Sequence, residues 1–293
     1  MKLGRLGSAG AERPVVATES GIFDLSEVTP DLDRDFFAGD GIQQVQRAVG
    51  SGSLPALSPA ATRVGAPLRM TGSVVCVGMN YAAHAAESSA KPPRQPVIFL
   101  KTNNTVGGPD DPVQLPRNST KTDWEVELAL VIGARASYLD SPADSIHHIA
   151  GFTVADDLSE RTFQLEESGG QWSKGKCCAG FTPTGPWLVT PDELDYHDLR
   201  LRSWVNGEPR QDSSTADLIF DVDFLIWHLS QYLVLEPGDL LLTGTPEGVA
   251  LSGRFPYLGA GDVVEVEIEG IGRQRHELQA WTRSGAAPAE ASA

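Results

Sequence analysis

Residues 122–132 read Thr-Asp-Trp-Glu-Val-Glu-Leu-Ala-Leu-Val-Ile, an alternation of carboxylates with apolar residues that runs into a continuous apolar sequence. This period of two predicts a strand that carries Asp123, Glu125 and Glu127 on one face, each roughly 7 Å from the next. A solvated strand face is the alternative interpretation. The apolar continuation is typical of a strand that enters a core, where unpaired carboxylates are costly. A hard divalent cation bound by oxygen ligands would remove that cost.

A second acidic pair, Asp156-Asp157, ends the apolar run from Ile149 to Ala155. The residues that follow begin like a helix, which we expect over Leu158 to Glu167, and an Asp at this point could serve as its N-cap. Alternatively, two Glu from one strand and one Asp from the end of another would form half a shell of oxygen ligands. Such a shell, with places left for water and substrate, suits Mg²⁺ or Mn²⁺ better than Zn²⁺.

The rest of the chain predicts a mostly β fold with some α structure. Short Val, Ile and Leu runs broken by Gly and Pro are typical of strands. They occur at Val74–Val77, Pro96–Leu100, Glu127–Gly133 and Leu240–Leu242. Further helices are expected over Tyr81–Ser88 and Asp221–Leu233.

The domain organisation is expected to be a small N-terminal domain with a linker over residues 1–70 and a catalytic domain over 71–283. The first part should contain a hairpin around Val15–Phe23 and an amphipathic stretch from Gly41 to Val49. The passage from Ser51 to Pro67 is rich in Ser, Pro and Ala and is typical of a linker. Residues 284–293 are Ala, Pro, Glu and Ser, which predicts a disordered tail.

Charge and composition exclude several classes of function. The formal net charge of −16 argues against nucleic-acid binding and requires local positive charge wherever an acidic substrate binds. No apolar run approaches the 18 or so residues that a membrane span needs, and no signal peptide is apparent, so we expect a cytoplasmic protein. The three cysteines, Cys76, Cys177 and Cys178, do not form a disulfide framework. No His and Asp set supports a nucleophilic role for them.

A longer series of motifs surrounds these carboxylates in a fixed order. They are Val75–Tyr81 with His84 and Glu87, Pro96–Lys101, Asp123–Leu128, Asp157–Gln164, Gln171–Lys176, Gly185–Trp187, Val205–Gly207, Arg210-Gln211, Thr215–Phe220, Pro237–Asp239 and Thr243–Val249. Over about residues 72–279 this ordered set resembles the fumarylacetoacetate hydrolase family.

The resemblance implies a catalytic domain of mixed β-roll type, a homodimer, and one divalent cation per chain, Mg²⁺ or Mn²⁺, with Ca²⁺ as a possible occupant in a crystal. It assigns the metal ligands to Glu125, Glu127 and Asp157, with Asp156 as a neighbour. Lys176 matches the active-site lysine of the family. The substrate contacts fall on Arg161, Gln211 and Thr245.

His84 and Glu87 lie three residues apart, so that their side chains can meet on one face of a short helix. A surface histidine with an incidental acidic neighbour is the alternative. In the family this pair lies on a lid that closes over the metal and activates water, which favours hydrolysis here. The lid, Tyr81 to about Pro93, has little apolar surface and is expected to be mobile or partly open without a ligand.

The implied activity is metal-dependent hydrolysis of a C–C bond in a small anionic 2-oxo acid. Residues 121–125 and 169–176 resemble bacterial members that cleave acylpyruvates or 2,4-diketo sugar acids. Decarboxylation or tautomerisation of a 2-oxo diacid would use the same enolate and stays open. Residues 177–180, Cys-Cys-Ala-Gly, replace a more polar family pattern beside Lys176, so a catalytically weakened metal-binding homologue is the third possibility.

Overall fold

A ten-stranded mixed sheet forms the centre of the molecule in the computed structural model, which describes residues 1–57, 62–69, 72–87 and 91–282. Its strand order is β4-β3-β2-β1-β14-β11-β10-β17-β5-β6. The strands are β1 (Lys2–Leu6), β2 (Arg13–Thr18), β3 (Gly21–Asp24), β4 (Ala56–Leu57), β5 (Val74–Gly78), β6 (Val97–Lys101), β10 (Val126–Ile132), β11 (Ile149–Asp156), β14 (Leu188–Val189) and β17 (Leu240–Leu242).

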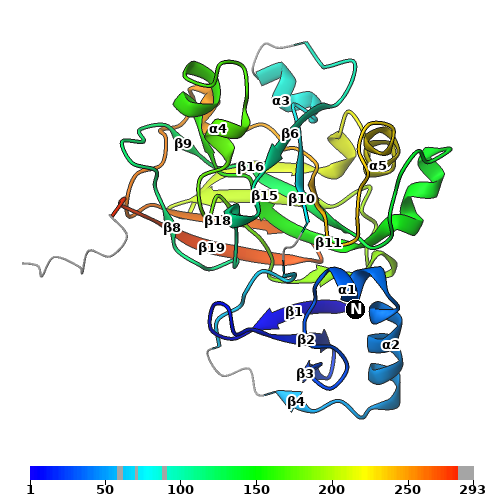
Figure 1. Ribbon diagram of the computed structural model, residues 1–293. Coiled ribbons are helices and arrows are strands. Elements are labelled where there is room, and N and C mark those ends of the chain that lie inside the picture. The colour runs from blue at the N-terminus through cyan, green and yellow to red at the C-terminus, as the bar shows by residue number, and fades with distance from the viewer. Residues whose placement is uncertain (58–61, 70–71, 88–90, 283–293) are drawn as a thin grey trace, which may run out of the picture.

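A second, five-stranded sheet has the order β16-β15-β18-β19-β8 (Figure 1). Its strands are β8 (Val113–Gln114), β15 (Arg200–Val205), β16 (Glu208–Ser214), β18 (Val263–Ile268) and β19 (Gly272–Gln279). Buried and more exposed residues alternate along β15, β18 and β19, as expected for strands with one face on a core.

Strand β10 is buried along its whole length because both of its faces pack against apolar side chains. Leu128 and Leu130 belong to the core that contains Val264 and Val266 of the second sheet. Ala129 and Val131 face the opposite way, into a core formed largely by the N-terminal residues. Strands β11 and β17 pair with its two edges, both antiparallel. The strand that carries Glu127 is therefore enclosed on both faces, as is its neighbour β11, which is also buried along its whole length.

The N-terminal part confirms the expected hairpin, as β2 and β3, and the expected amphipathic stretch is the helix α2 (Gly41–Ser51). Its strands continue the main sheet, because β1 pairs with β14 through Lys2 and Val189. The passage expected as a linker contains β4, which pairs with β3, and residues 58–61 lie outside the described residues. The division into two domains stays a prediction, and the tail at 284–293 also lies outside the described residues.

Three helices cover the sheets: α1 (Arg34–Ala38), α2 and α5 (Val222–Ser230). Helix α5 confirms most of the predicted Asp221–Leu233 segment, and the Asp221 carboxylate accepts the Phe224 N–H at its start. The predicted mostly β architecture with some helix is thus confirmed. Among the described residues, none of the helices has the length and hydropathy needed to cross a membrane.

The predicted strand over residues 122–132 is interrupted before β10. Thr122–Asp123 form β9, which pairs with β12 (Ser159–Glu160), and the ladder of β10 begins only at Val126. The interruption arises because side-chain oxygens, instead of the backbone of a neighbouring strand, accept the N–H groups of residues 125 and 126. The Glu125 N–H donates to Asp156 Oδ1 at 2.8 Å, and the Val126 N–H donates to Gln211 Oε1 at 3.1 Å.

The helix expected to begin at Leu158 begins later. Ser159 and Glu160 are the strand β12, and a single π-helical turn covers Thr162–Glu166. The pairing of Ser159 with Asp123 holds this backbone extended, so the helical start predicted from the acidic pair was wrong by about four residues.

Candidate metal centre and active site

The carboxylates of Glu125, Glu127 and Asp157 converge at one point of the main sheet. Each offers an oxygen within 4.8 Å of those of the other two, and all three residues are buried. Glu125 directly precedes β10, Glu127 is its second residue, and Asp157 directly follows β11. The two segments are joined by strand pairing and by the Asp157 N–H, which donates to the Glu125 carbonyl at 2.9 Å.

Asp156 holds this geometry in place instead of capping a helix. Its Oδ1 accepts the Glu125 N–H, and its Oδ2 lies 2.9 Å from Nε2 of His276 on β19. Both Asp156 and His276 are fully buried. The second sheet is thereby connected to the strand end that carries the carboxylates.

Two lysines and one arginine contact two of the three carboxylates. Lys176 Nζ lies 2.5 Å from Glu125 Oε2 and 2.6 Å from Asp157 Oδ2. Arg161 Nη2 lies 2.7 Å from Glu125 Oε1, and Lys101 Nζ donates to Asp157 Oδ1. Burial by itself would raise the pKa of Glu125, but Lys176 and Arg161 outweigh it and lower this pKa to about 2.

Glu127 has no such cation, and this makes the site suitable for a metal ion. Its Oε2 accepts the Gly244 N–H at 2.7 Å, and no ion pair of Glu127 exists among the described residues. Burial, followed by the charges of Asp157 and Glu125, raises the pKa of Glu127 well above its usual range. An all-oxygen set with an uncompensated buried carboxylate fits a hard divalent cation such as Mg²⁺ or Mn²⁺.

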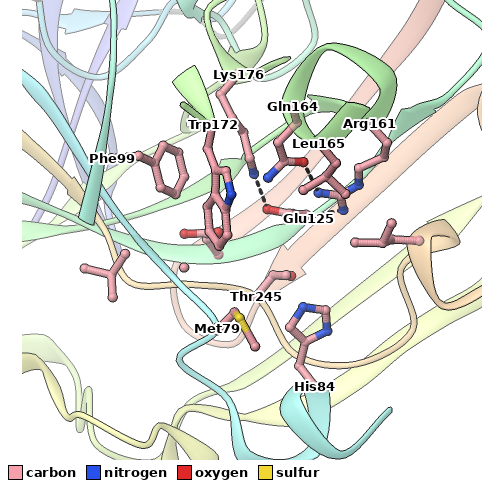
Figure 2. Close-up of a pocket in the computed structure, with 14 residues that line it drawn as sticks. Met79, His84, Phe99, Glu125, Arg161, Gln164, Leu165, Trp172, Lys176 and Thr245 are labelled. Atoms are coloured by element: carbon pink, nitrogen blue, oxygen red, sulfur yellow. Dashed lines mark hydrogen bonds and ion pairs between the residues drawn. The ribbon is translucent and has the colours of Figure 1, made fainter. Parts of the chain in front are cut away.

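A cavity of about 250 Å³ opens directly onto these groups (Figure 2). Besides Glu125, Glu127, Arg161 and Lys176, its wall consists of Val77, Gly78, Met79, His84, Phe99, Gln164, Leu165, Trp172, Thr245 and Leu251. His84 and Thr245 lie across the cavity from Lys176 in Figure 2. The cavity is slightly smaller than the roughly 300 to 1,000 Å³ that is typical of ligand pockets.

His84 and Glu87 both lie on the short helix α3 (Ala82–Glu87), as expected, but they do not form a hydrogen bond. His84 Nδ1 is 4.0 Å from Glu87 Oε2 and has no hydrogen-bond partner among the described residues. Glu87 instead accepts the Gly248 N–H at 3.0 Å and an Arg254 N–H at 2.9 Å. Burial lowers the pKa of His84, which favours its neutral form.

The helix α3 closes over the pocket in this structure, since His84 is only 7% exposed and Ala85 is fully buried. The expected mobility of the lid stays a prediction, and its residues 88–90 lie outside the described residues.

The expected substrate contacts differ in position. Thr245 and Arg161 line the cavity, whereas Gln211 lies behind Thr245 and does not form part of the wall. The Gln211 amide donates to Thr245 Oγ1 at 2.8 Å and accepts from the backbone N–H of Val126.

Asp123, which was expected on the same strand face as Glu125 and Glu127, lies apart from the three converging carboxylates. It binds Arg161 and the N–H groups of Ala250 and Leu251.

The cysteines beside Lys176 lack the features of a nucleophile. Burial raises the pKa of Cys178 to about 11, so this thiol stays protonated at neutral pH. The Cys177 thiol contacts the carbonyl of Leu100.

Several residues of the site were not singled out from the sequence, among them Lys101, Trp172 and His276. Lys101 and Trp172 both belong to the motifs given above. The apolar run before Lys101 could have indicated that this lysine is buried. His276 lies on an alternating strand between the exposed Arg275 and Glu277 and on the same face as the buried Leu278, so the alternation could have placed it on the buried face.

Comparison with known proteins agrees with this geometry. Residues 73–279 match the family model described as "Fumarylacetoacetate (FAA) hydrolase C-terminal". The chain is 42% identical to 2,4-didehydro-3-deoxy-L-rhamnonate hydrolase of Sphingomonas sp. (strain SKA58), over 97% of this chain and 98% of that protein.

Solved structures agree as well. A fumarylacetoacetate hydrolase from Exiguobacterium antarcticum is 32% identical with a TM-score of 0.83, and a maleylpyruvate hydrolase from Sphingobium sp. SYK-6, in complex with manganese(II) and pyruvate, is 27% identical with a TM-score of 0.77. Each comparison covers 96% of this chain and all of the other. A 5-carboxymethyl-2-hydroxymuconate delta-isomerase from Mycobacterium smegmatis is 34% identical with a TM-score of 0.77, again over 96% of this chain and all of the other. On the strength of its matched residues and its relatives, the chain belongs to the fumarylacetoacetate hydrolase family.

Proposed function

We propose that this protein is a Mg²⁺- or Mn²⁺-dependent hydrolase that cleaves a C–C bond in a small 2,4-dioxo acid, an acylpyruvate or a diketo acid derived from a sugar. The observation that carries the proposal is the convergence of Glu125, Glu127 and Asp157 at the base of a cavity that also holds His84. The relatives that act on a diketo sugar acid and on maleylpyruvate support the same substrate class.

Glu125, Glu127 and Asp157 are the proposed metal ligands. A divalent ion held there would polarise the substrate's 2-oxo group and stabilise the enolate that forms when the neighbouring C–C bond breaks. Lys176 adds a second positive charge beside the same oxygens. Arg161 and Thr245 line the remainder of the polar wall and would orient the acid and carbonyl groups of the substrate.

His84 is the proposed general base. In its neutral form Nε2 takes a proton from water, and the hydroxide adds to the C4 carbonyl carbon. The C3–C4 bond then breaks with its electron pair going to C3, and protonation at C3 releases one carboxylic acid and one 2-oxo acid. Glu87, 4.0 Å from Nδ1, would stabilise the positive charge on the imidazolium.

An NMR assay of the Mg²⁺-loaded protein tests the proposal directly. Acylpyruvate, oxaloacetate and a 2,4-diketo sugar acid are incubated separately, and the products are identified. Formation of pyruvate and a carboxylic acid from acylpyruvate, or of the corresponding pair from the sugar acid, supports hydrolysis. Turnover of oxaloacetate alone would replace the proposal with decarboxylation.

Isomerisation is the second candidate, because a relative of 34% identity is a 5-carboxymethyl-2-hydroxymuconate delta-isomerase. The same enolate, protonated at another carbon without attack by water, would give a tautomer. A pure isomerase would convert its substrate to a product of equal mass in the same assay. A weakened homologue, the possibility raised by residues 177–180, would bind Mg²⁺ and turn over none of the three acids.

We also propose that the protein is a homodimer in the cytoplasm, as the resemblance implies. Sedimentation equilibrium tests the dimer: a mass of twice 31.3 kDa supports it, and a mass of one chain contradicts it.

A further inference from the structure

The wall of the cavity combines charged and apolar side chains. Its charged residues are Glu125, Glu127, Arg161 and Lys176. Its large apolar residues are Met79, Phe99, Leu165, Trp172 and Leu251, and the centroid of the Phe99 ring lies 5.2 Å from Lys176 Nζ. In Figure 2, Trp172 and Phe99 lie on one side of the cavity and Leu165 on the other. A substrate whose oxo acid end binds at the carboxylate group would extend its tail between these apolar side chains.

The backbone at residues 78 and 79 positions the apolar side chains of Trp172 and Met79. A Cβ on Gly78 would come within 2.3 Å of the Trp172 ring, so this ring packs directly against the glycine backbone. The ring also contacts Phe99, with 5.8 Å between the centroids. Met79 follows in a left-handed conformation at φ 56°, which a residue with a side chain adopts at an energetic cost.

Two leucines flank the opening of the cavity. Leu165 is 46% exposed and Leu251 is 37% exposed, so both side chains reach the solvent at the edge of the cavity. Leu251 is held in place through its backbone, because its N–H donates to Asp123 Oδ2 at 2.9 Å. The opening is therefore apolar. Asp123, the carboxylate that holds Leu251 there, also binds Arg161.

The cations of the wall are already in use. Arg161 donates through Nε to Asp123, through Nη1 to Gln164 and through Nη2 to Glu125, at 2.7 to 2.8 Å. Lys176 is shared by Glu125 and Asp157. Arg254, which is not part of the wall, is bound to Glu87. None of the residues that line the cavity offers an unpaired cation to a second carboxylate on the substrate.

We propose, building on the proposed function, that Trp172, Leu165 and Leu251 restrict the substrate to 2-oxo acids with one carboxylate and a short uncharged tail. A second carboxylate at the end of the tail would lose its water against leucine and tryptophan and would gain no counter-charge. It would also enter a protein of net charge −16.

Binding of two matched acids tests this selectivity without any turnover. The Mg²⁺-loaded full chain is titrated by calorimetry with 2-oxohexanoate and with 2-oxoadipate, which have the same number of carbons and differ only in a terminal methyl or carboxylate. Neither has a 4-oxo group, so neither can be cleaved by the proposed reaction. We expect 2-oxohexanoate to bind at least about tenfold more tightly, which corresponds to about 1.4 kcal/mol.

Two arginine variants of exposed leucines identify the residues responsible. Leu251→Arg places a cation at the opening and should lower the preference for 2-oxohexanoate at least about tenfold. Leu100→Arg adds the same charge at a leucine that is 49% exposed and outside the cavity wall, so it should leave the ratio unchanged. Trp172→Ala should weaken 2-oxohexanoate binding about fivefold or more and leave pyruvate, which has no tail, unaffected.

Equal affinities in the unaltered protein, tighter binding of 2-oxoadipate, or no binding of either acid would overturn the inference. So would an equal change of the ratio in Leu251→Arg and Leu100→Arg. The proposed hydrolysis fails separately, if the expected binding ratio is found but no dioxo acid is cleaved.

Discussion

His84 is the residue whose environment bears most directly on the reaction. It is buried, it lines the cavity opposite Lys176, and its Nδ1 has no partner among the described residues. Glu87, the residue expected to orient it, is held by Gly248 and Arg254. In the closed arrangement the imidazole therefore depends on packing more than on a hydrogen bond, and Glu87 acts on it through charge.

Replacing His84 with alanine should separate hydrolysis from the other reactions. We expect His84→Ala to slow C–C hydrolysis by about 10² or more, since that is the lower range for a lost general base. Metal affinity should be unchanged because His84 is not among the converging carboxylates. Rates are measured by NMR and Mg²⁺ binding by calorimetry.

Decarboxylation of oxaloacetate, which needs no activated water, serves as the internal control for this variant. If His84→Ala keeps full hydrolysis while Lys176→Ala abolishes it, the water-activating role is wrong, and the enzyme is better described as a decarboxylase or tautomerase.

The pH dependence of hydrolysis follows from the same residue. Burial lowers the pKa of His84 below its usual value of 6.5, and a general base is active only when it is unprotonated. Activity should therefore be retained as the pH falls through 6.5 and be lost only at lower pH. The kcat/KM profile measures this, with His84→Ala as the control that lacks this acidic limb. A midpoint above 6.5 in the unaltered protein would contradict the burial argument.

At the scale of the elements, β19 supports the metal centre from the second sheet. His276 Nε2 lies 2.9 Å from Asp156 Oδ2, and Asp156 in turn accepts the Glu125 N–H. The same strand presents Glu277 to the solvent on its other face. A residue far from the substrate thus fixes the backbone of one proposed ligand.

His276→Ala should destabilise the fold by about 1 to 3 kcal/mol, the cost of leaving a buried acceptor without its donor. It should also weaken Mg²⁺ binding, because the Glu125 backbone loses support. Glu277→Ala is the matched control on the same strand and should change neither quantity. Denaturant unfolding and calorimetry measure both effects, and a loss of stability with unaltered Mg²⁺ affinity would limit His276 to a structural role.

The elements also show which features could be predicted from the sequence. The apolar run Leu128 to Ile132 indicated a core strand correctly, because burial on both faces depends on composition alone. The break at Trp124 and Glu125 was missed, since the acceptors that cause it, Asp156 and Gln211, are supplied by segments 31 and 85 residues away. Gln211 was expected to contact the substrate. Its amide donates to Thr245, which lines the cavity, and its contact with the substrate stays a prediction.

At the scale of the whole molecule, the site lies where two cores meet. One face of β10 packs on the second sheet and α5, and the other packs on a core that includes Val16 and Phe36 of the N-terminal part. The carboxylates at the start of β10 are therefore enclosed by segments from most of the chain. Charge placed there acts on the stability of the entire fold.

Removing the metal should lower the thermal stability of the whole protein. The folded state alone assembles the three carboxylates, so a bound ion stabilises it, by about 2.7 kcal/mol at a free concentration of 100 Kd. Without an ion, Lys176 compensates Glu125 and Asp157 but not Glu127. A carboxyl group whose pKa is raised in the folded state costs stability once the pH exceeds its unfolded pKa.

Glu127→Gln separates the stabilisation by a bound ion from the cost of the Glu127 charge in the protein without an ion. Glutamine can still accept the Gly244 N–H but carries no charge, so the variant without metal should melt at a higher temperature than the unaltered protein without metal. Mg²⁺ should raise the melting temperature of the unaltered protein and have little effect on the variant. Scanning calorimetry at neutral pH, with Mg²⁺ or with excess chelator, gives the four values. If the unaltered protein melts at the same temperature in chelator after confirmed loss of the metal, the three carboxylates do not hold an ion that stabilises the fold.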